Sequence, residues 1–92
     1  LNPTGTGMDQ DVLAAIARHV VDENDRRRAR GERPVFLMYD QVYWSLEFGR
    51  MDPITPQGLV PEVAPYTVLL DAISKSLAAT GLRVGWSVAA PR

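Results

Sequence analysis

The stretch LLDAISKSLAATGLRVGW, from Leu69 to Trp86, contains the only lysine of a 92-residue chain that has nine arginines. Lys75 follows an apolar run and precedes a Gly-Leu-Arg turn, which places its amine at the end of a predicted strand. The short link to the next apolar run predicts that the two flanking strands are antiparallel. A desolvated lysine is a good nucleophilic amine, whereas the structural alternative is a side chain that snorkels from the strand end into water.

The composition is that of one small globular domain, and it excludes several classes of site. Hydrophobic residues make up 46% and charged residues 23% of the chain, as in folded rather than disordered proteins. The net charge of −1 gives no indication of a nucleic-acid or membrane partner. Because the sequence has no cysteine and one histidine, disulfides and thiolate or His-rich metal sites are excluded. We expect a cytoplasmic protein, since no apolar run approaches about 20 residues and no signal peptide is recognisable.

The first third of the sequence predicts a turn followed by an amphipathic helix. The turn is NPTGTG, residues 2–7, in which Asn precedes Pro and two glycines follow. Asp9 is the expected N-cap, with Thr6 as the second choice, and Gly31 is the expected stop. The arginines near the end of the helix are interpreted as solvated cations that complement the helix dipole. The predicted apolar stripe comprises Val12, Leu13, Ile16, Ala17 and Val20.

Three apolar runs predict an α/β fold with a mostly parallel sheet flanked by helices and an antiparallel last strand. Val35–Asp40 and Tyr66–Ser74 are continuous runs, which are typical of parallel strands buried on both faces. Leu82–Ala90 is predicted to be the third strand. A further strand is expected before Leu1, so that the chain would be a piece of a longer βαβ-containing protein.

The connection between the first two predicted strands is expected to have no strand of its own. QVYWSLEF, residues 41–48, is interpreted as a short amphipathic piece that ends at Gly49. Residues 50–65 are predicted to be a loop, because four prolines and a glycine exclude a central strand.

Polar residues gather where the predicted strands end. Asn2, Asp40, Ser74 and Lys75 all occupy such positions, and ligands of open α/β sheets bind at that edge. Pyridoxal phosphate needs an amine for its aldehyde, an anion for its pyridine nitrogen, donors for its phenolate oxygen and a cation for its phosphate. The residues that would meet these needs are, in that order, Lys75, Asp40, Tyr43 with Asn2, and Arg83.

Each of these residues also has a purely structural explanation. Asp40 would cap a helix after its strand, and Tyr43 would be a packing aromatic. Asn2 would only form a turn, and Arg83 would pair with a surface carboxylate. These explanations, together with a snorkelling Lys75, require five unrelated coincidences, whereas the cofactor interpretation uses all five residues once.

Three segments together resemble the pyridoxal-phosphate-dependent aminotransferases of the aspartate aminotransferase type (class I/II, fold type I). They are NPTGT, YDQVYWSLEFG and SKSLAATGLRVGW, which follow the family's order and span essentially the whole chain. The resemblance implies that Lys75 forms the Schiff base with pyridoxal 5'-phosphate and moves the proton between the substrate α-carbon and cofactor C4′. It also implies that Asp40 pairs with the pyridinium nitrogen. By the same resemblance, Tyr43 and Asn2 bond the phenolate oxygen and Arg83 binds the phosphate.

Two positions depart from the family's pattern. Gln41 stands where many members have Glu or Ser, at a position that is expected to be peripheral. Ala72 stands three residues before the lysine, where many members have a phosphate-binding Ser. Phosphate binding would therefore depend more on Arg83, with Ser74 as a weaker donor. The residues not expected to be catalytic are His19, Trp44 and Trp86.

The resemblance implies an aminotransferase that moves an amino group between an amino acid and a 2-oxo acid, without a nucleic-acid or membrane partner. Residues 1–92 would be part of the large, cofactor-binding domain, without its N-terminal part and the C-terminal small domain. The segment alone would be inactive, and the full-length protein would be a homodimer. The alternatives are another fold type I enzyme (a lyase or decarboxylase), an aminotransferase-like domain of a regulator, or a plain βαβ scaffold without cofactor.

Overall fold

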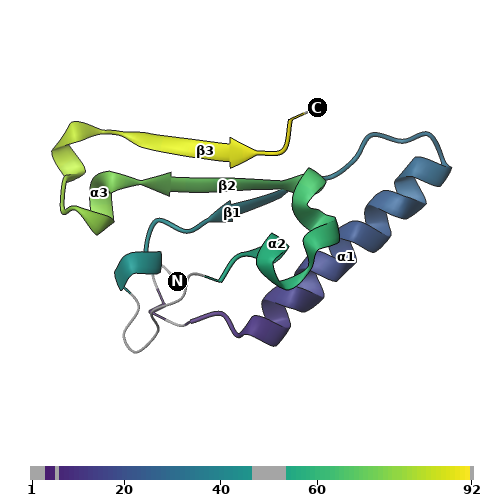
Figure 1. The fold of residues 1–92 in the computed structure, drawn as a ribbon, viewed down its shortest axis with the longest axis horizontal. Helices are drawn as coiled ribbons and strands as arrows, with labels where there is room; N and C mark the ends of the chain where they lie inside the picture. Colours follow the sequence, from purple (N-terminus) through teal and green to yellow (C-terminus); the bar gives the residue numbers. More distant parts are fainter. Residues whose placement is uncertain (1–3, 6, 47–53, 92) are drawn as a thin grey trace.

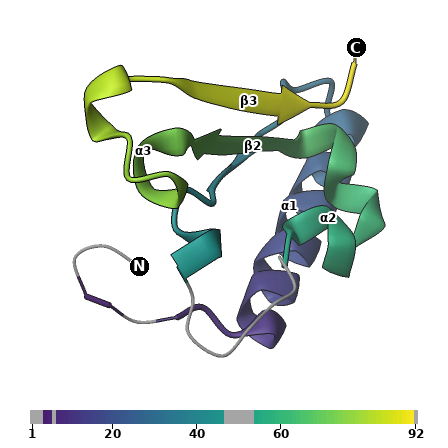
Figure 2. The ribbon, with the colours of Figure 1, turned by 60° about the vertical axis from the view of Figure 1, so that its left-hand side comes forward.

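The protein is an α/β structure in which the helices group beside one part of a three-stranded sheet (Figures 1 and 2). The computed structural model describes residues 4–5, 7–46 and 54–91. The predicted Thr6, Gly49 and Pro53, like Asn2, lie outside the described residues. The elements are, in chain order, α1 (Gln10–Ala29), β1 (Leu37–Asp40), η1 (Trp44–Leu46), α2 (Pro56–Leu59), η2 (Pro61–Tyr66), β2 (Thr67–Ala72), α3 (Ile73–Ser76), η3 (Thr80–Leu82) and β3 (Gly85–Ala89), where η marks a 3-10 helix.

The sheet confirms the predicted fold class and the predicted direction of its last strand. The strand order is β1-β2-β3, with β1 parallel to β2 and β2 antiparallel to β3. In the first pair Asp40 lies opposite Leu70, and in the second Ala72 lies opposite Gly85. The short link that contains α3 and η3 therefore reverses the chain, as the sequence predicts.

Helix α1 begins and ends where the sequence predicts. Asp9 is the N-cap, and its Oδ1 accepts a hydrogen bond from the Asp11 N–H at 3.3 Å, which satisfies a donor that the first turn leaves free. Gly31 has a φ of +68° and donates its N–H to the Arg28 carbonyl at 3.1 Å, while Glu32 donates to Arg27 at 2.9 Å. This pair of bonds is a Schellman motif, which requires a left-handed residue and so favours glycine.

The buried face of α1 differs by one position from the predicted stripe. Leu13, Ala14 and Ala17 are buried, whereas Val12 is 52% and Ile16 37% exposed. The helix packs against α2 and η2, which Figure 1 shows beside it on the same side of the sheet. Small alanines at this contact allow the close approach that Val12 and Ile16 would have prevented. The core of this contact comprises Ala14, Ala17, Val60 and Val63, with Val20, Val21, Leu59 and Tyr66 packed around it.

The prediction that residues 50–65 form only a loop was wrong for the part that the structure describes. From Ile54 to Tyr66 the chain forms α2 and η2, and no strand lies among these residues. Thr55 caps α2 by accepting the Gly58 N–H on its Oγ1 at 3.2 Å, and Pro56 follows at the first helical position. Thr-Pro is a helix start signal, since proline lacks only an N–H that would have no partner there.

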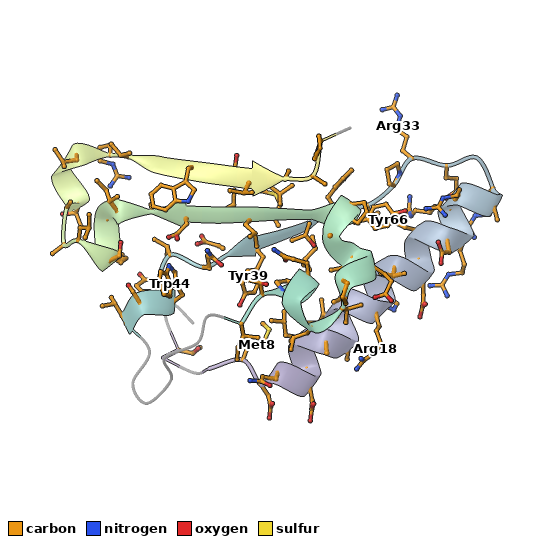
Figure 3. All side chains as sticks on the ribbon, viewed as in Figure 1. Met8, Arg18, Arg33, Tyr39, Trp44 and Tyr66 are labelled. Carbon is orange, nitrogen blue, oxygen red and sulfur yellow. The ribbon has the colours of Figure 1, made fainter. Side chains whose placement is uncertain are left out.

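The strands are shorter and less buried than predicted. β1 spans Leu37–Asp40 with alternating burial, and Met38 is 67% exposed, so it is not buried on both faces. Tyr39, which is half-buried, donates a hydrogen bond from its hydroxyl to the Ile54 carbonyl at 3.1 Å, just before α2 (Figure 3). β2 ends at Ala72, so the predicted strand residues 73 and 74 lie in α3 instead.

The piece predicted for residues 41–48 is a single 3-10 turn, η1, in the described part of that segment. Among the described residues, no helix is both long and apolar enough to cross a membrane.

Candidate functional site

The sheet topology brings the predicted site residues to one edge. Because β1 and β2 are parallel, Asp40 at the end of β1 and the residues after β2 share the carboxyl edge of the sheet. β3 runs the other way, so it begins at that edge, and the segment just before Gly85 lies there too. Two further backbone bonds continue the ladders there, from Gln41 N–H to Leu70 carbonyl at 3.0 Å and from Ile73 N–H to Val84 carbonyl at 3.3 Å.

Lys75 lies on α3, the single helical turn that follows β2 at this edge. The turn ends at once, with Leu77 donating its N–H to the Ile73 carbonyl at 3.1 Å. The lysine is half-buried, and its Nζ lies 5.5 Å from the centroid of the Tyr43 ring. A cation at this distance from an aromatic face is attracted by the ring quadrupole. Two of the predicted site residues, 32 positions apart in the sequence, are therefore in contact.

Asp40 is exposed at the end of β1 and turns the chain toward η1. Its Oδ1 accepts the Val42 N–H at 3.1 Å, an Asx turn of the kind that often follows a strand. This Asx turn precedes η1, which begins at Trp44, and it takes the place of the helix-capping role that the sequence offers as an alternative. It uses one carboxylate oxygen and leaves Oδ2 without a hydrogen bond to the described residues, so a second role remains compatible with the geometry.

Arg83 and Ser74 complete the described part of the predicted set. Arg83 follows η3 with a left-handed backbone (φ +53°), and its Nη1 donates to the Thr80 carbonyl at 3.1 Å. Ser74 is half-buried on α3. Within the described ranges, no hydrogen bond or ion pair joins Lys75, Asp40 and Arg83 to one another. These three charges share an edge without neutralising each other directly.

Asp71 is the residue at this edge that the sequence interpretation missed. Its Oδ2 accepts the Trp44 indole Nε1–H at 3.0 Å and lies 3.5 Å from Gln41 Nε2, while its Oδ1 accepts the Ala72 N–H at 2.7 Å. Figure 3 shows Trp44 on η1, close to the end of the sheet. A sequence signal was available, because Asp71 is a lone carboxylate inside the apolar run Tyr66–Ser74.

The residues at this edge fit pyridoxal phosphate by their chemistry. An amine, a carboxylate, a phenol and a guanidinium reach one rim of the sheet from three separate segments, and two of them are already in contact. Among the described residues, no group of three or more His, Cys, Asp or Glu side chains lies close enough to hold a metal ion.

Comparison with known proteins agrees with this chemistry. The whole chain, residues 1–92, matches the family described as aminotransferase class I and II. A probable aspartate/prephenate aminotransferase of Aquifex aeolicus (strain VF5) is 32% identical over 90 residues, which are 98% of this chain and 20% of the relative. An aspartate aminotransferase of Streptomyces avermitilis is 30% identical over 87 residues, which are 95% of this chain and 19% of the relative.

The chain spans about a fifth of the length of the curated relatives that it matches. No solved structure matches it at a comparable level of significance. The match to the family nevertheless covers every residue, and it includes the segments that carry Lys75, Asp40 and Arg83. The chain belongs to the class I and II aminotransferase family.

Proposed function

We propose that the chain is part of an enzyme that transfers an amino group between an amino acid and a 2-oxo acid with the help of pyridoxal 5'-phosphate. The observation that carries the proposal is the placement of the Lys75 amine over the Tyr43 ring, at the edge of the sheet shared with Asp40 and Arg83. Membership in the aminotransferase family supports it independently. The names of the relatives make aspartate the first amino donor to test.

Each residue of the edge has a proposed task toward the cofactor. Lys75 holds it covalently through its amine, and Asp40 faces the pyridine nitrogen, where a carboxylate keeps that nitrogen protonated. Arg83 holds the phosphate as a charge-assisted donor, with Ser74 as a second donor. The phenolate oxygen is left to Tyr43, and to Asn2, which lies outside the described residues.

The bound cofactor supplies an electron sink for negative charge that develops at the substrate α-carbon. Lys75 has the second task of moving a proton between that α-carbon and C4′ of the cofactor. A half-buried amine on a short helical turn suits this task, because it is held near the site while its four-carbon stem can still rotate.

We also propose that residues 1–92 form part of a larger cofactor-binding domain in a cytoplasmic homodimer, and that they do not transaminate alone. The chain covers about a fifth of its relatives, and every residue of β3 is exposed, including Trp86 and Val88. Apolar side chains exposed in such numbers mark surfaces that other protein covers.

Borohydride reduction of the full-length protein tests the proposed role of Lys75. Reduction converts a linkage between the cofactor aldehyde and an amine into a stable secondary amine, so peptide mapping is expected to find the added mass on Lys75. Lys75→Ala is expected to lose the label and the visible absorbance of the bound cofactor. It should also lose almost all amino transfer from aspartate to a 2-oxo acid, a loss of at least about a thousandfold for a covalent catalyst. Arg18→Ala, an exposed cation on α1, is the control and should behave as wild type.

Label on another lysine, or a Lys75→Ala protein that transfers amino groups at the wild-type rate, would overturn the proposal. Cofactor labelling at Lys75 without amino transfer from any amino acid would retain the site but assign a different reaction, such as a lyase or decarboxylase.

A further inference from the structure

Asp71 lies between the two segments that carry the proposed site. It is the penultimate residue of β2, four positions before Lys75, and it stands opposite Trp86 in the register with β3. Its side chain is half-buried and turns toward the segment after β1, which carries Asp40 and Tyr43. No task has been assigned to it in the proposed function.

The two carboxylate oxygens of Asp71 hold different parts of the chain. Oδ1 accepts the N–H of Ala72, the residue that precedes the first turn of α3, at 2.7 Å. Oδ2 accepts the Trp44 indole N–H at 3.0 Å and has Gln41 Nε2 at 3.5 Å. Hydrogen bonds to an ionised carboxylate are about twice as strong as neutral ones. The Asp71 side chain therefore links Ala72, just before α3, to the segment that carries Tyr43.

The positions of the partners determine what this link controls. Gln41 and Trp44 flank Tyr43 on either side, so the carboxylate fixes the short stretch on which the phenol is presented. α3 is one turn long and makes few bonds of its own, so its orientation depends on how Ala72, the residue just before it, is held. Lys75 Nζ and the Tyr43 ring centroid are 5.5 Å apart, and they belong to the two segments that Asp71 joins.

We propose that Asp71 is a positioning residue that sets the placement of Tyr43 relative to Lys75 by bonding Trp44 with one oxygen and Ala72 with the other. The proposal rests on the function proposed above, since it gives Asp71 a task only where Lys75 and Tyr43 both hold the cofactor. Trp44 thereby becomes a part of the site, although it need not contact substrate or cofactor. Asp71 has no direct contact with the reacting atoms in this proposal.

The test measures cofactor affinity of the full-length protein, by equilibrium dialysis against pyridoxal 5'-phosphate. Asp71→Ala and Trp44→Phe are each expected to raise the dissociation constant at least about tenfold, the smallest loss expected for one charged hydrogen bond. Asp71→Asn keeps one acceptor oxygen and should fall between Asp71→Ala and wild type. If Asp71 acts through Trp44, combining both changes should weaken binding no further than Asp71→Ala alone. Trp86→Phe, the same change on β3, is the matched control and should bind as wild type.

A second measurement needs no cofactor. In the ¹⁵N-labelled protein without cofactor, the indole N–H resonance that disappears in Trp44→Phe belongs to Trp44. That resonance is expected to shift in Asp71→Ala, because its acceptor has been removed. If Asp71→Ala does not fold, Trp44→Phe and Asp71→Asn carry the same comparison.

The outcomes separate this inference from the proposed function. Wild-type protein that takes up no cofactor would refute the proposed function. Wild-type protein that binds cofactor, with Asp71→Ala and Trp44→Phe binding equally well, would refute only the positioning role. An unmoved Trp44 indole resonance in Asp71→Ala would refute the hydrogen bond on which that role depends.

Discussion

Two residues beside η3 have a left-handed backbone without being glycine. Ala78 has a φ of +50° and Arg83 a φ of +53°, a conformation that costs an L-residue about 1–2 kcal/mol. Arg83 needs its side chain for the proposed phosphate contact, so its strain falls on a residue with a proposed task, and backbone strain is often found at such sites. Ala78 lies two residues after the end of α3 and donates its N–H to the Lys75 carbonyl at 3.3 Å, but its methyl group has no proposed task.

Ala78→Gly is therefore expected to stabilise the protein. Relief of the strain, about 1–2 kcal/mol, exceeds the entropic cost of glycine, about 0.5–1 kcal/mol, so the free energy of unfolding should rise by roughly 0.5 kcal/mol. Urea unfolding of the full-length protein measures the change. The matched control is Ala79→Gly at the next position, where φ is −103° and the same substitution should lower stability by about 0.5–1 kcal/mol. Equal losses in both variants would contradict the strain argument.

At the scale of elements, Asn24 joins helix α1 to the beginning of the sheet. It is 2% exposed, its Nδ2 donates to the Val35 carbonyl at 3.0 Å, and its Oδ1 accepts the Val35 N–H at 2.9 Å. The amide thus pairs with the backbone just before β1 as a neighbouring strand would. A buried asparagine in the middle of a helix is unfavourable unless both its donor and its acceptor are satisfied, as they are here.

Asn24→Leu, which preserves the branched shape of the side chain, is expected to lower the free energy of unfolding by about 2–3 kcal/mol. The reason is that it leaves the N–H and carbonyl of Val35 without partners in a partly buried position. Thermal or urea unfolding measures the loss. Asp25→Leu on the next residue removes only an exposed ion pair with Arg28 at 3.4 Å, so it should change stability by no more than about 0.5 kcal/mol. A loss as small in Asn24→Leu would show that the Asn24–Val35 pair contributes little.

The elements differ in how well sequence could predict them, because their causes are local to different degrees. The ends of α1 were predictable since capping at Asp9 and the left-handed turn at Gly31 depend only on nearby residues. The face that α1 buries was not, because it depends on α2 and η2, which begin about 40 residues later. Those two helices were missed because the prolines that exclude a strand also start short helices.

The sequence could predict which of the candidate residues share the carboxyl edge of the sheet, but not how they are arranged there. Parallel pairing of two apolar runs is enough to bring Asp40 and Lys75 to one edge. The approach of Lys75 to Tyr43 depends on the single turn α3, in a segment predicted to begin as strand. Asp40 ends one apolar run and Asp71 lies inside the next, and the sequence marks both carboxylates without giving the partners of either.

At the scale of the whole molecule, the charge clusters that affect folding lie away from the candidate site. The described residues extend 45 Å along their longest axis, with α3 at one end and the C-terminal end of α1 at the other (Figure 1). At the α1 end, Glu23 pairs with Arg26 at 3.0 Å and Arg27 at 2.8 Å, and Glu32 pairs with Arg30 at 2.7 Å. These contacts support the interpretation of the arginines as a solvated, paired cluster rather than a binding patch.

The ion pairs lower the pKa of both carboxyl groups from their ordinary value near 4.5, chiefly through hydrogen bonds from Arg26 to Glu23 and from Arg30 to Glu32. A carboxyl whose pKa is lower in the folded state stabilises the fold above its unfolded pKa, and the stabilisation disappears as the pH falls through the folded value. The free energy of unfolding should therefore decrease below about pH 4.5. Glu23→Gln combined with Glu32→Gln should flatten this part of the pH profile.

Three comparisons identify the ion pairs as the cause. In 1 M NaCl, where the screening length is about 3 Å, the difference between wild type and the double variant should shrink. Asp22→Asn, a carboxyl on the same helix without an ion pair among the described residues, should keep the wild-type profile. Cofactor affinity at pH 7 should be the same in all these proteins, because the charges lie at the opposite end from α3. A double variant with the wild-type acid profile would show that carboxyl groups elsewhere dominate acid unfolding. A double variant with altered cofactor affinity would show that the two ends of the molecule are coupled.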